Sequence, residues 1–203
     1  MSMQRSGKRD EILDVASRSV IEKGFAATSI EEIIADVGIT KSGFFYHFAD
    51  KNELAKALFQ RYIDAEDQLF DELEKRAFEL NEDPLHGFLI NLKLLAELLG
   101  DLPNGHPGCL IASYCYQSQL FNAEIRQMNQ SALRSWNTRF RARLEEISAV
   151  YPPSREVDLD ELAQMLITIV EGAIITARAI GDPGVLPRQI MLYRDYGRSI
   201  FQP

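Results

Sequence analysis

Residues 40–51 carry most of the side chains whose chemistry could recognise another molecule. The hydrogen-bond donors of this segment are the side chains of Thr40, Lys41, Ser42, Tyr46, His47 and Lys51. Ammonium, hydroxyl and imidazole groups all donate to phosphate oxygens, and the positive end of a helix also favours a phosphate. The pattern therefore predicts contact with a nucleic-acid backbone. The alternative is that Lys41 and Lys51 form a solvated surface and that His47 has only a structural role.

Two short helices are expected to position these donors. Thr28-Ser29-Ile30-Glu31 is interpreted as a capping box that opens the first helix. Gly38 ends that helix, and Thr40 caps a second one that runs to about Phe48. Two helices joined by so tight a turn are typical of a helix-turn-helix, whose second helix enters the DNA major groove. Phe44 and Phe48 are expected in the core beneath it.

The rest of the sequence also predicts helices, and no segment has the sustained alternation that marks a strand. The further helices are expected at about Lys8–Lys23, Asn52–Glu79, Pro84–Leu99, Cys109–Gln119, Ala123–Val150 and Leu159–Ile180, with a last one after Gly184. On the first helix, Ile12, Leu13, Ala16 and Val20 share one face. The predicted fold is all-α, with a helix-turn-helix domain over residues 1–52 and a helical effector-binding and dimerisation domain over residues 53–203.

Composition limits the possible classes of protein. The 203 residues are 46% hydrophobic and 26% charged, which is ordinary for a soluble globular chain. No stretch approaches the roughly 20 uninterrupted apolar residues of a membrane span, and the N-terminal nine residues lack the apolar core of a secretory signal. We therefore expect a cytoplasmic protein that does not enter the membrane.

The charge is distributed unevenly. Residues 1–52 hold seven Lys/Arg and eight Asp/Glu, a net charge of −1, and residues 53–203 hold fifteen and twenty-two, a net charge of −7. These two values account for the formal charge of −8. A surface that binds nucleic acid without selectivity is normally basic, so DNA contact must come from a local patch.

The helix-turn-helix segment resembles the TetR family of regulators. The matching residues are Gly24–Ile30, Ile33–Ala35, Gly38–Lys41 and Phe45–Phe48, with Lys51 and Leu54. Phe45 is a departure, because many relatives have Tyr there. The resemblance implies a homodimer that binds a palindromic double-stranded operator. It also implies DNA contacts by Thr28, Ser29, Thr40, Lys41, Ser42, Gly43, Tyr46, His47 and Lys51, although Ser29 could serve only to begin a helix.

The resemblance further implies a second domain that dimerises through its last two helices and holds a small-molecule pocket. The expected interface residues are Leu166, Ile169, Gly172, Ala173, Thr176, Ile190, Tyr193 and Gly197, and the alternative for them is packing within one subunit. The candidate pocket residues are Phe59, Tyr62, Phe88, Leu92, Cys109, Ser113, Tyr116, Trp136, Phe140 and Met165. Simple core packing is the alternative for each of these.

Three further features have competing interpretations. Cys109, at a predicted helix start, could sense an electrophile or oxidant or could be an inert buried thiol. The run Arg139, Arg141 and Arg143 could attract an anionic effector or form a solvated face. His106 and Cys109 have loose metal-ligand spacing, but no second pair accompanies them, so no metal is expected.

The sequence thus predicts a repressor that leaves its palindromic operator when a small molecule binds. An alternative is a DNA-binding regulator controlled by a protein partner with no small-molecule effector. An enzyme is the rival from another class. The chain lacks a glycine-rich phosphate loop, a His-Glu-x-x-His motif and a Gly-x-Ser-x-Gly elbow, so neither catalysis nor a cofactor is expected.

Overall fold

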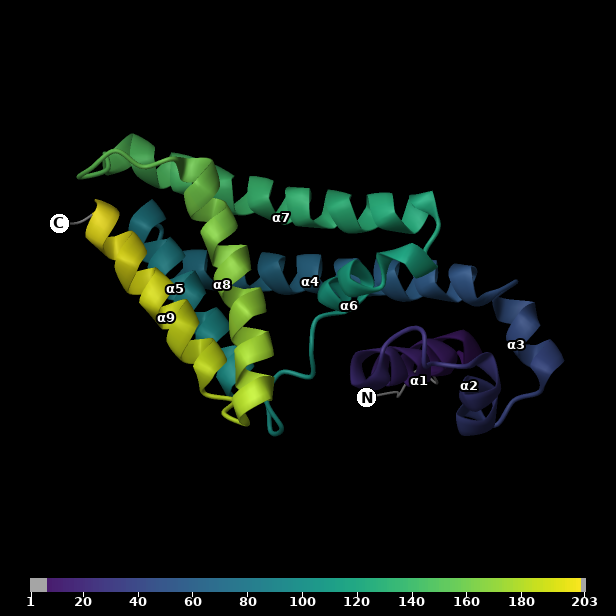
Figure 1. Cartoon of the computed structure of the whole chain (residues 1–203). Helices are drawn as coiled ribbons and strands as arrows, with labels where there is room; N and C mark the ends of the chain where they lie inside the picture. The colour runs from purple at the N-terminus through teal and green to yellow at the C-terminus, as the bar shows by residue number, and fades with distance from the viewer. Residues whose placement is uncertain (1–6, 202–203) are drawn as a thin grey trace. The chain divides into compact units, whose positions relative to one another are not determined.

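A computed structural model describes residues 7–201 (Figure 1). Within that range the chain forms α-helices and one short 3-10 helix, with no strand, which confirms the predicted all-α class. The helices are α1 (Lys8–Lys23), α2 (Ile30–Val37), α3 (Lys41–His47), α4 (Lys51–Leu80), α5 (Pro84–Gly100), α6 (Leu110–Tyr116), η1 (Ser118–Leu120), α7 (Ala123–Val150), α8 (Leu159–Ile180) and α9 (Val185–Phe201). Residues 1–6, which contribute to the expectation about a secretory signal, lie outside the described residues.

Most predicted helix ends agree with the structure because local capping chemistry sets them. Asp50 and Asp83 accept hydrogen bonds from the backbone of Glu53 and His86, both at 2.8 Å, and so begin α4 and α5. The helix predicted from Cys109 to Gln119 is shorter than expected. It ends at Tyr116, and a separate 3-10 turn follows. The side chain of Gln117 instead accepts a hydrogen bond from the Ala26 backbone, 3.1 Å away.

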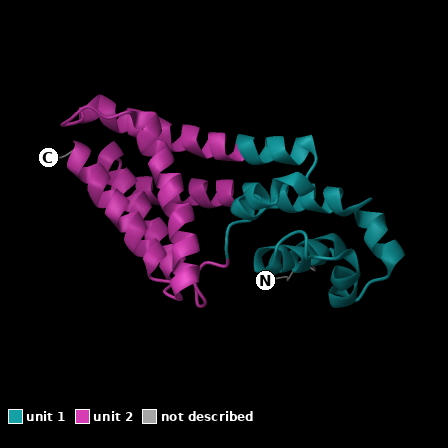
Figure 2. Ribbon diagram, in the orientation of Figure 1, with its two compact units in different colours: residues 1–65, 108–131 teal, residues 66–107, 132–203 magenta. Residues whose placement is uncertain are grey.

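The described residues divide into two compact units (Figure 2). Unit 1 comprises the chain up to Ala65 together with Gly108–Ser131, and unit 2 comprises Glu66–Pro107 together with the chain from Ala132. Both α4 and α7 contribute residues to each unit. The boundary predicted at residue 52 separates functional domains, and it stays a prediction.

The core of unit 1 includes the predicted face of α1. Ile12, Leu13, Ala16 and Val20 are all buried there, as the helical spacing indicated. An aromatic cluster formed by Phe25, Phe59, Tyr114 and Phe121 completes this core. Phe59 stacks on Tyr114 at 5.1 Å between ring centroids, and Tyr114 stacks on Phe121 at 4.2 Å. The cluster joins residues of α4 and α6 to the loop that follows α1.

Unit 2 is built around contacts of α9 with α5 and α8 (Figure 1). The Tyr193 hydroxyl donates to the Leu162 carbonyl at 2.9 Å, and the Arg194 side chain donates to the Leu89 carbonyl at 3.0 Å. Burial raises the pKa of Tyr193 far above its usual value. The phenol therefore stays protonated and serves as a fixed donor between α8 and α9.

Five of the eight predicted dimer residues are buried inside the protomer, which corrects their assignment. Leu166, Ala173, Ile190 and Tyr193 are buried within unit 2 and form its own core. For Leu166 and Ala173 the error arose because α8 is apolar nearly all round between Leu166 and Ile175, so the sequence does not show which face points inward. Ile169, Gly172 and Thr176 are at least partly exposed, whereas Gly197 is buried.

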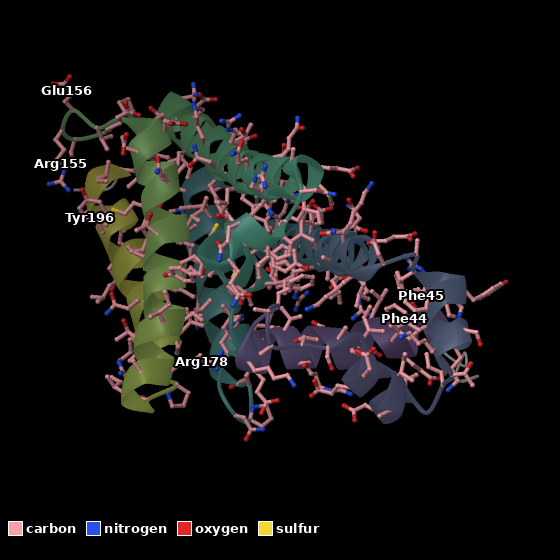
Figure 3. All side chains as sticks on the ribbon, turned by 45° about the vertical axis from the view of Figure 1, so that its right-hand side comes forward. Phe44, Phe45, Arg155, Glu156, Arg178 and Tyr196 are labelled. Atoms are coloured by element: carbon pink, nitrogen blue, oxygen red, sulfur yellow. The ribbon has the colours of Figure 1, made fainter. Side chains whose placement is uncertain are left out.

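The remaining apolar surface of α8 is extensive. The helix is long and apolar enough to cross a membrane by length and composition, yet only 28% of its most apolar 18-residue window is buried within the protomer. Met165, Ile175 and Ile180 are exposed on α8, as are Leu192 and Tyr196 on α9. The Arg155 guanidinium lies 5.1 Å from the centre of the Tyr196 ring (Figure 3).

Candidate nucleic-acid interface and ligand cavity

The turn between α2 and α3 is set by the left-handed conformation of Gly38. Its φ of 68° and ψ of 42° favour glycine, which has no Cβ. The Gly38 amide donates to the Ala35 carbonyl at 3.2 Å, and the Ile39 amide donates to the Ile34 carbonyl at 3.1 Å. This pattern ends α2 as a Schellman motif. Thr40 is already extended and begins α3, so the two helices are joined by three residues, as predicted.

Two buried phenylalanines hold α3 against the core of unit 1. Phe44 and Phe48 are almost fully buried, with ring centroids 5.8 Å apart, which confirms their predicted place in the core. The Arg9 guanidinium lies 5.2 Å from the centre of the Phe48 ring. A helix of seven residues has little stability of its own. Its orientation therefore depends on these buried rings.

The opposite face of α3 is exposed and rich in donors. Lys41 and Ser42 are exposed, Tyr46 is 85% exposed, and the half-buried His47 ring lies 5.0 Å from that of Tyr46. Phe45, the departure from the family pattern, is also exposed, next to the buried Phe44 (Figure 3). The first turn of α3 contains no acidic residue. The helix thus presents cationic and neutral donors together with its positive end.

The N-terminus of α3 is capped by a neutral group. The Thr40 hydroxyl accepts from the Gly43 amide at 3.1 Å and lies 3.0 Å from the Ser42 hydroxyl. A Cβ on Gly43 would lie 3.3 Å from that Thr40 oxygen. Gly43 therefore makes room for the cap, a role that the sequence did not suggest. The Lys41 ammonium lies 3.7 Å from Glu31 of α2, and both groups are exposed.

The predicted capping box of α2 was wrong by one residue. Ser29, not Thr28, is the N-cap, and its hydroxyl accepts from the Glu32 amide at 3.1 Å. Thr28 is buried, and its hydroxyl donates to the Gly24 carbonyl at 3.0 Å. A hydroxyl held in this way ties the end of α1 to the start of α2. We therefore do not retain Thr28 among the proposed DNA contacts.

Lys51 has a structural partner that the sequence did not reveal. Its ammonium donates to the Phe25 carbonyl at 2.7 Å and lies 4.4 Å from the centre of the Phe25 ring. Burial lowers the pKa of Lys51. An ammonium has further N–H groups to donate, so this contact fixes the side chain and leaves its phosphate role a prediction.

Of the ten predicted pocket residues, five belong to each unit. In unit 1, Phe59 belongs to the aromatic core, and Tyr116 is 74% exposed. Cys109 is buried, and the Tyr62 hydroxyl lies 3.5 Å from its sulfur. The Ser113 hydroxyl donates to the Cys109 carbonyl at 3.1 Å. These contacts fit a packed interior better than a ligand site.

In unit 2, Trp136 and Phe140 pack edge-on against Phe70, with ring centroids 5.7 and 5.5 Å away. The Trp136 indole also donates to Asp67 at 3.1 Å. Leu92 is buried and Met165 is exposed. The remaining predicted pocket residue, Phe88, lines a cavity.

That cavity has a volume of about 480 Å³ and lies where α4, α5 and α7 meet within unit 2. It is lined by Asp71, Glu74, Lys75, Ala77, Phe78, Asn81, Glu82, Asp83, Pro84, Gly87, Phe88, Asn91, Arg143 and Glu146. The sequence prediction missed most of these residues because it sought apolar and aromatic groups. The helical spacing of Asp71, Glu74, Lys75 and Phe78 on α4 was the available signal, since residues so spaced share a face.

The three arginines considered as an anion site are all ion-paired. Arg139 contacts Asp71 at 2.7 Å and Glu74 at 3.4 Å, and Arg143 contacts Glu74 at 3.1 Å. Arg141 pairs with Glu145 at 2.9 Å. Although burial opposes it, hydrogen bonding and attraction to these carboxylates raise the pKa of both Arg139 and Arg143. Arg139 and Arg143 thus join α4 and α7, whereas Arg141 pairs within α7.

Two family profiles match the sequence. The profile described as bacterial regulatory proteins of the tetR family matches residues 12–58, which contain the helix-turn-helix. A profile for the C-terminal domain of transcriptional regulators similar to LmrA and YxaF matches residues 84–189, more than half of the chain.

Known proteins agree with these matches. The chain is 27% identical over 169 residues to the HTH-type transcriptional regulator ArpR of Pseudomonas putida, which covers 82% of this chain and 78% of that protein. It is 23% identical to the uncharacterised regulator YxaF of Bacillus subtilis, over 84% of this chain and 85% of that protein. A TetR-family regulator from Agrobacterium tumefaciens has the same fold, with a TM-score of 0.78 and 24% identity over 96% of this chain and 97% of that one. The chain therefore belongs to the TetR family and is a DNA-binding transcriptional regulator, not an enzyme.

Proposed function

We propose that this protein is a cytoplasmic, homodimeric repressor that holds a palindromic operator with two copies of α3 and releases it when a small molecule binds in the helical domain. The observation that carries this proposal is the exposed face of α3, where donors project from a short helix whose other face is fixed by Phe44 and Phe48. Proteins of the family bind DNA operators and generally act as homodimers with small-molecule effectors.

The proposed DNA contacts divide into two kinds. Tyr46, His47 and Lys51 supply donors to phosphates, which give affinity and register but carry no sequence information. Lys41, Ser42 and the backbone near Gly43 lie at the N-terminus of the helix, the part that faces base edges in a helix-turn-helix. Ser29 and Thr40 place the positive ends of α2 and α3 beside the phosphates.

The proposed dimer face comprises the exposed apolar residues of α8 and α9. Ile175 is 47% and Leu192 is 60% exposed, and a Cβ at the exposed Gly172 would meet no atom of the protomer within 4 Å. A second copy would cover this surface by a two-fold, self-complementary contact. Ile169 and Thr176 remain in this proposed face. The five predicted residues that are buried inside the protomer are not part of this proposed face.

Release of DNA requires an effector that binds one arrangement of the dimer better than another. Helix-turn-helix dimers enter successive major grooves only when their recognition helices are about 34–36 Å apart. Helix α4 contributes residues to both compact units. We propose that this helix transmits the change in spacing. Control by a protein partner would instead leave the affinity for DNA insensitive to every small molecule.

The test begins with selection of DNA from a random pool, followed by footprinting. We expect a palindrome with half-sites one helical turn apart, and protection without two-fold symmetry would refute the proposal. The triple variant Lys41→Ala/Tyr46→Ala/His47→Ala should lose at least about 100-fold in affinity at about 150 mM salt, because contacts are lost in both subunits. Lys75→Ala/Lys93→Ala, which removes two cations far from α3 in sequence, is the control and should bind normally.

A further inference from the structure

One part of the wall of the unit 2 cavity carries hydrogen-bond acceptors that have no donor within residues 7–201. Glu74 and Asn91 both line this cavity. Their side-chain oxygens Glu74 Oε1 and Asn91 Oδ1 are buried and have no hydrogen-bond partner among the described residues. Both atoms accept hydrogen bonds and donate none. Buried acceptors left without a partner cost free energy, and such groups in proteins are normally satisfied. A guest that donates N–H groups would satisfy them.

The charge of the lining points to a cation. Five lining carboxylates, those of Asp71, Glu74, Glu82, Asp83 and Glu146, face two lining cations, Lys75 and Arg143. The net formal charge of the lining is therefore −3. It becomes −2 when the adjoining Arg139, which pairs with Asp71 and Glu74, is included. Arg143 is itself engaged by Glu74 and Glu146, at 3.1 and 2.8 Å. An anionic guest would meet uncompensated negative charge, and a cationic guest would reduce it.

The other part of the wall is apolar. Ala77, Phe78, Pro84 and Phe88 line the same cavity, and Phe78 is among the most exposed large apolar side chains of the described chain. Faces of aromatic rings attract cations and stack on flat guests. The volume of about 480 Å³ lies within the range of about 300–1,000 Å³ for small-molecule sites. The cavity thus combines an aromatic surface with acceptors.

We propose that this cavity binds a flat aromatic organic cation that carries N–H donors, such as an arylamidinium or an arylammonium ion. The ring system lies against Phe78 and Phe88, and the donor group reaches Glu74 Oε1 and Asn91 Oδ1. Its identification as the effector site rests on the function proposed above, whereas binding of the cation does not.

The test uses calorimetric titration of the full chain, without DNA, with 2-naphthamidine and with 2-naphthoate. These probes share one ring system and differ in charge and in N–H donors. We expect saturable 1:1 binding of the amidine, at least about tenfold tighter than any binding of the carboxylate. No binding of the amidine up to its solubility limit, or equal binding of both probes, would overturn the proposal.

Two variants locate the site. Asn91→Leu keeps the number and branching of the side-chain heavy atoms but removes the acceptor, and Glu74→Gln removes the charge, so each should weaken amidine binding about tenfold. The matched control is Asn137→Leu, because Asn137 Oδ1 is also buried without a partner but its residue does not line the cavity. Because Glu74→Gln also disturbs Arg139 and Arg143, circular dichroism and the unfolding temperature must show that it is folded. Unchanged affinity in a folded Asn91→Leu protein would overturn the assignment.

A separate measurement tests whether the bound cation acts as the effector. Addition of 2-naphthamidine to the protein–operator complex should lower its affinity for DNA, and Asn91→Leu should reduce that effect. If the amidine binds but leaves the affinity for DNA unchanged, the cavity still binds aromatic cations as proposed, and only its role as the effector site is refuted. If the operator lacks two-fold symmetry, the proposed function fails while calorimetry still decides what the cavity binds.

Discussion

Helices α3 and α8 differ in the charge of the groups at their N-termini. Thr40 caps α3 with a neutral hydroxyl, and no acidic residue follows in its first turn. Asp158 caps α8 with a carboxylate, and Asp160 and Glu161 follow it. Negative groups at a helix N-terminus stabilise the helix by offsetting its dipole. Helix α8 uses this stabilisation, whereas α3 leaves its positive end available to another negative partner.

The exposed faces of the two helices differ in the same sense. Helix α3 exposes donors such as Tyr46, and α8 exposes apolar groups such as Ile175. A donor-rich face with an unneutralised N-terminus suits an anionic polymer, and an apolar face suits a copy of itself. The comparison teaches that the two proposed interfaces differ in electrostatics as well as in hydrophobicity.

The largest expected effect separates the inner and outer faces of α3. Phe44→Ala should lower the free energy of unfolding by about 3–5 kcal/mol, because it empties a fully buried site. Phe45→Ala, at a side chain 42% exposed, should cost less than about 1 kcal/mol. Urea denaturation followed by circular dichroism measures both. Equal losses would mean that α3 is not anchored in the way described.

The next effect tests the exposed face of α8. Ile175→Glu should raise the dimer dissociation constant at least about 100-fold, because two-fold symmetry places both new carboxylates in an apolar contact. Val150→Glu, at another exposed apolar residue outside α8 and α9, is the control. Sedimentation velocity over a range of concentrations measures the dissociation constant. A variant that dimerises as tightly as the wild type would remove α8 from the proposed interface.

An exchange of cap chemistry tests the comparison directly. Thr40→Asp keeps a good N-cap and should leave stability nearly unchanged. It should nevertheless weaken operator binding about tenfold or more, because a carboxylate in each subunit then faces phosphate. The reciprocal change, Asp158→Ser, should leave operator binding unchanged. Fluorescence anisotropy with labelled operator measures both, and full affinity in Thr40→Asp would show that no phosphate lies at this helix end.

The smallest expected effect is the pH dependence that Asp83 gives to the free energy of unfolding. Hydrogen bonds from the His86 backbone and the Tyr151 hydroxyl lower the pKa of Asp83, the cap of α5, to about 2. A carboxyl with a depressed folded-state pKa stabilises the fold above its unfolded pKa of about 4, and this contribution is lost as the pH falls towards 2. The difference in unfolding free energy between wild type and Asp83→Asn should be about 1 kcal/mol or less near pH 6, because the Asp83 side chain is partly exposed and solvent screens its interactions.

This difference should shrink near pH 3, and urea denaturation at the two pH values measures it. Ser29→Ala is the control, because it removes a hydroxyl cap that does not titrate. Its effect on unfolding should be the same at both pH values. A difference for Asp83→Asn that grows on acidification would contradict the assigned pKa.

The contrast between α3 and α8 also explains what could be predicted from the sequence. The ends of α3 depend on Gly38 and Thr40, which act on residues within one helical turn, so their spacing predicts the turn and the exposed donors. The inward faces of α8 and α9 depend on how these two helices pack on each other and on how α9 packs on α5, which is distant from both in sequence. For that reason Leu166 and Tyr193 were assigned to the wrong surface. The cavity was missed for a similar reason, since its acceptors on α4 and α5 meet only in the folded unit.

The aromatic cluster around Tyr114 has a consequence for exchanging parts between relatives. The Tyr114 hydroxyl donates to the Ala55 carbonyl at 2.9 Å, and its ring packs against Phe25, which directly follows α1. Part of the hydrophobic interior that packs against α1 and the loop after it is therefore supplied by residues more than fifty positions downstream. A chimeric regulator that receives only the first 52 residues of another family member would join two surfaces never selected to fit. The transferable module is discontinuous and includes residues 108–131.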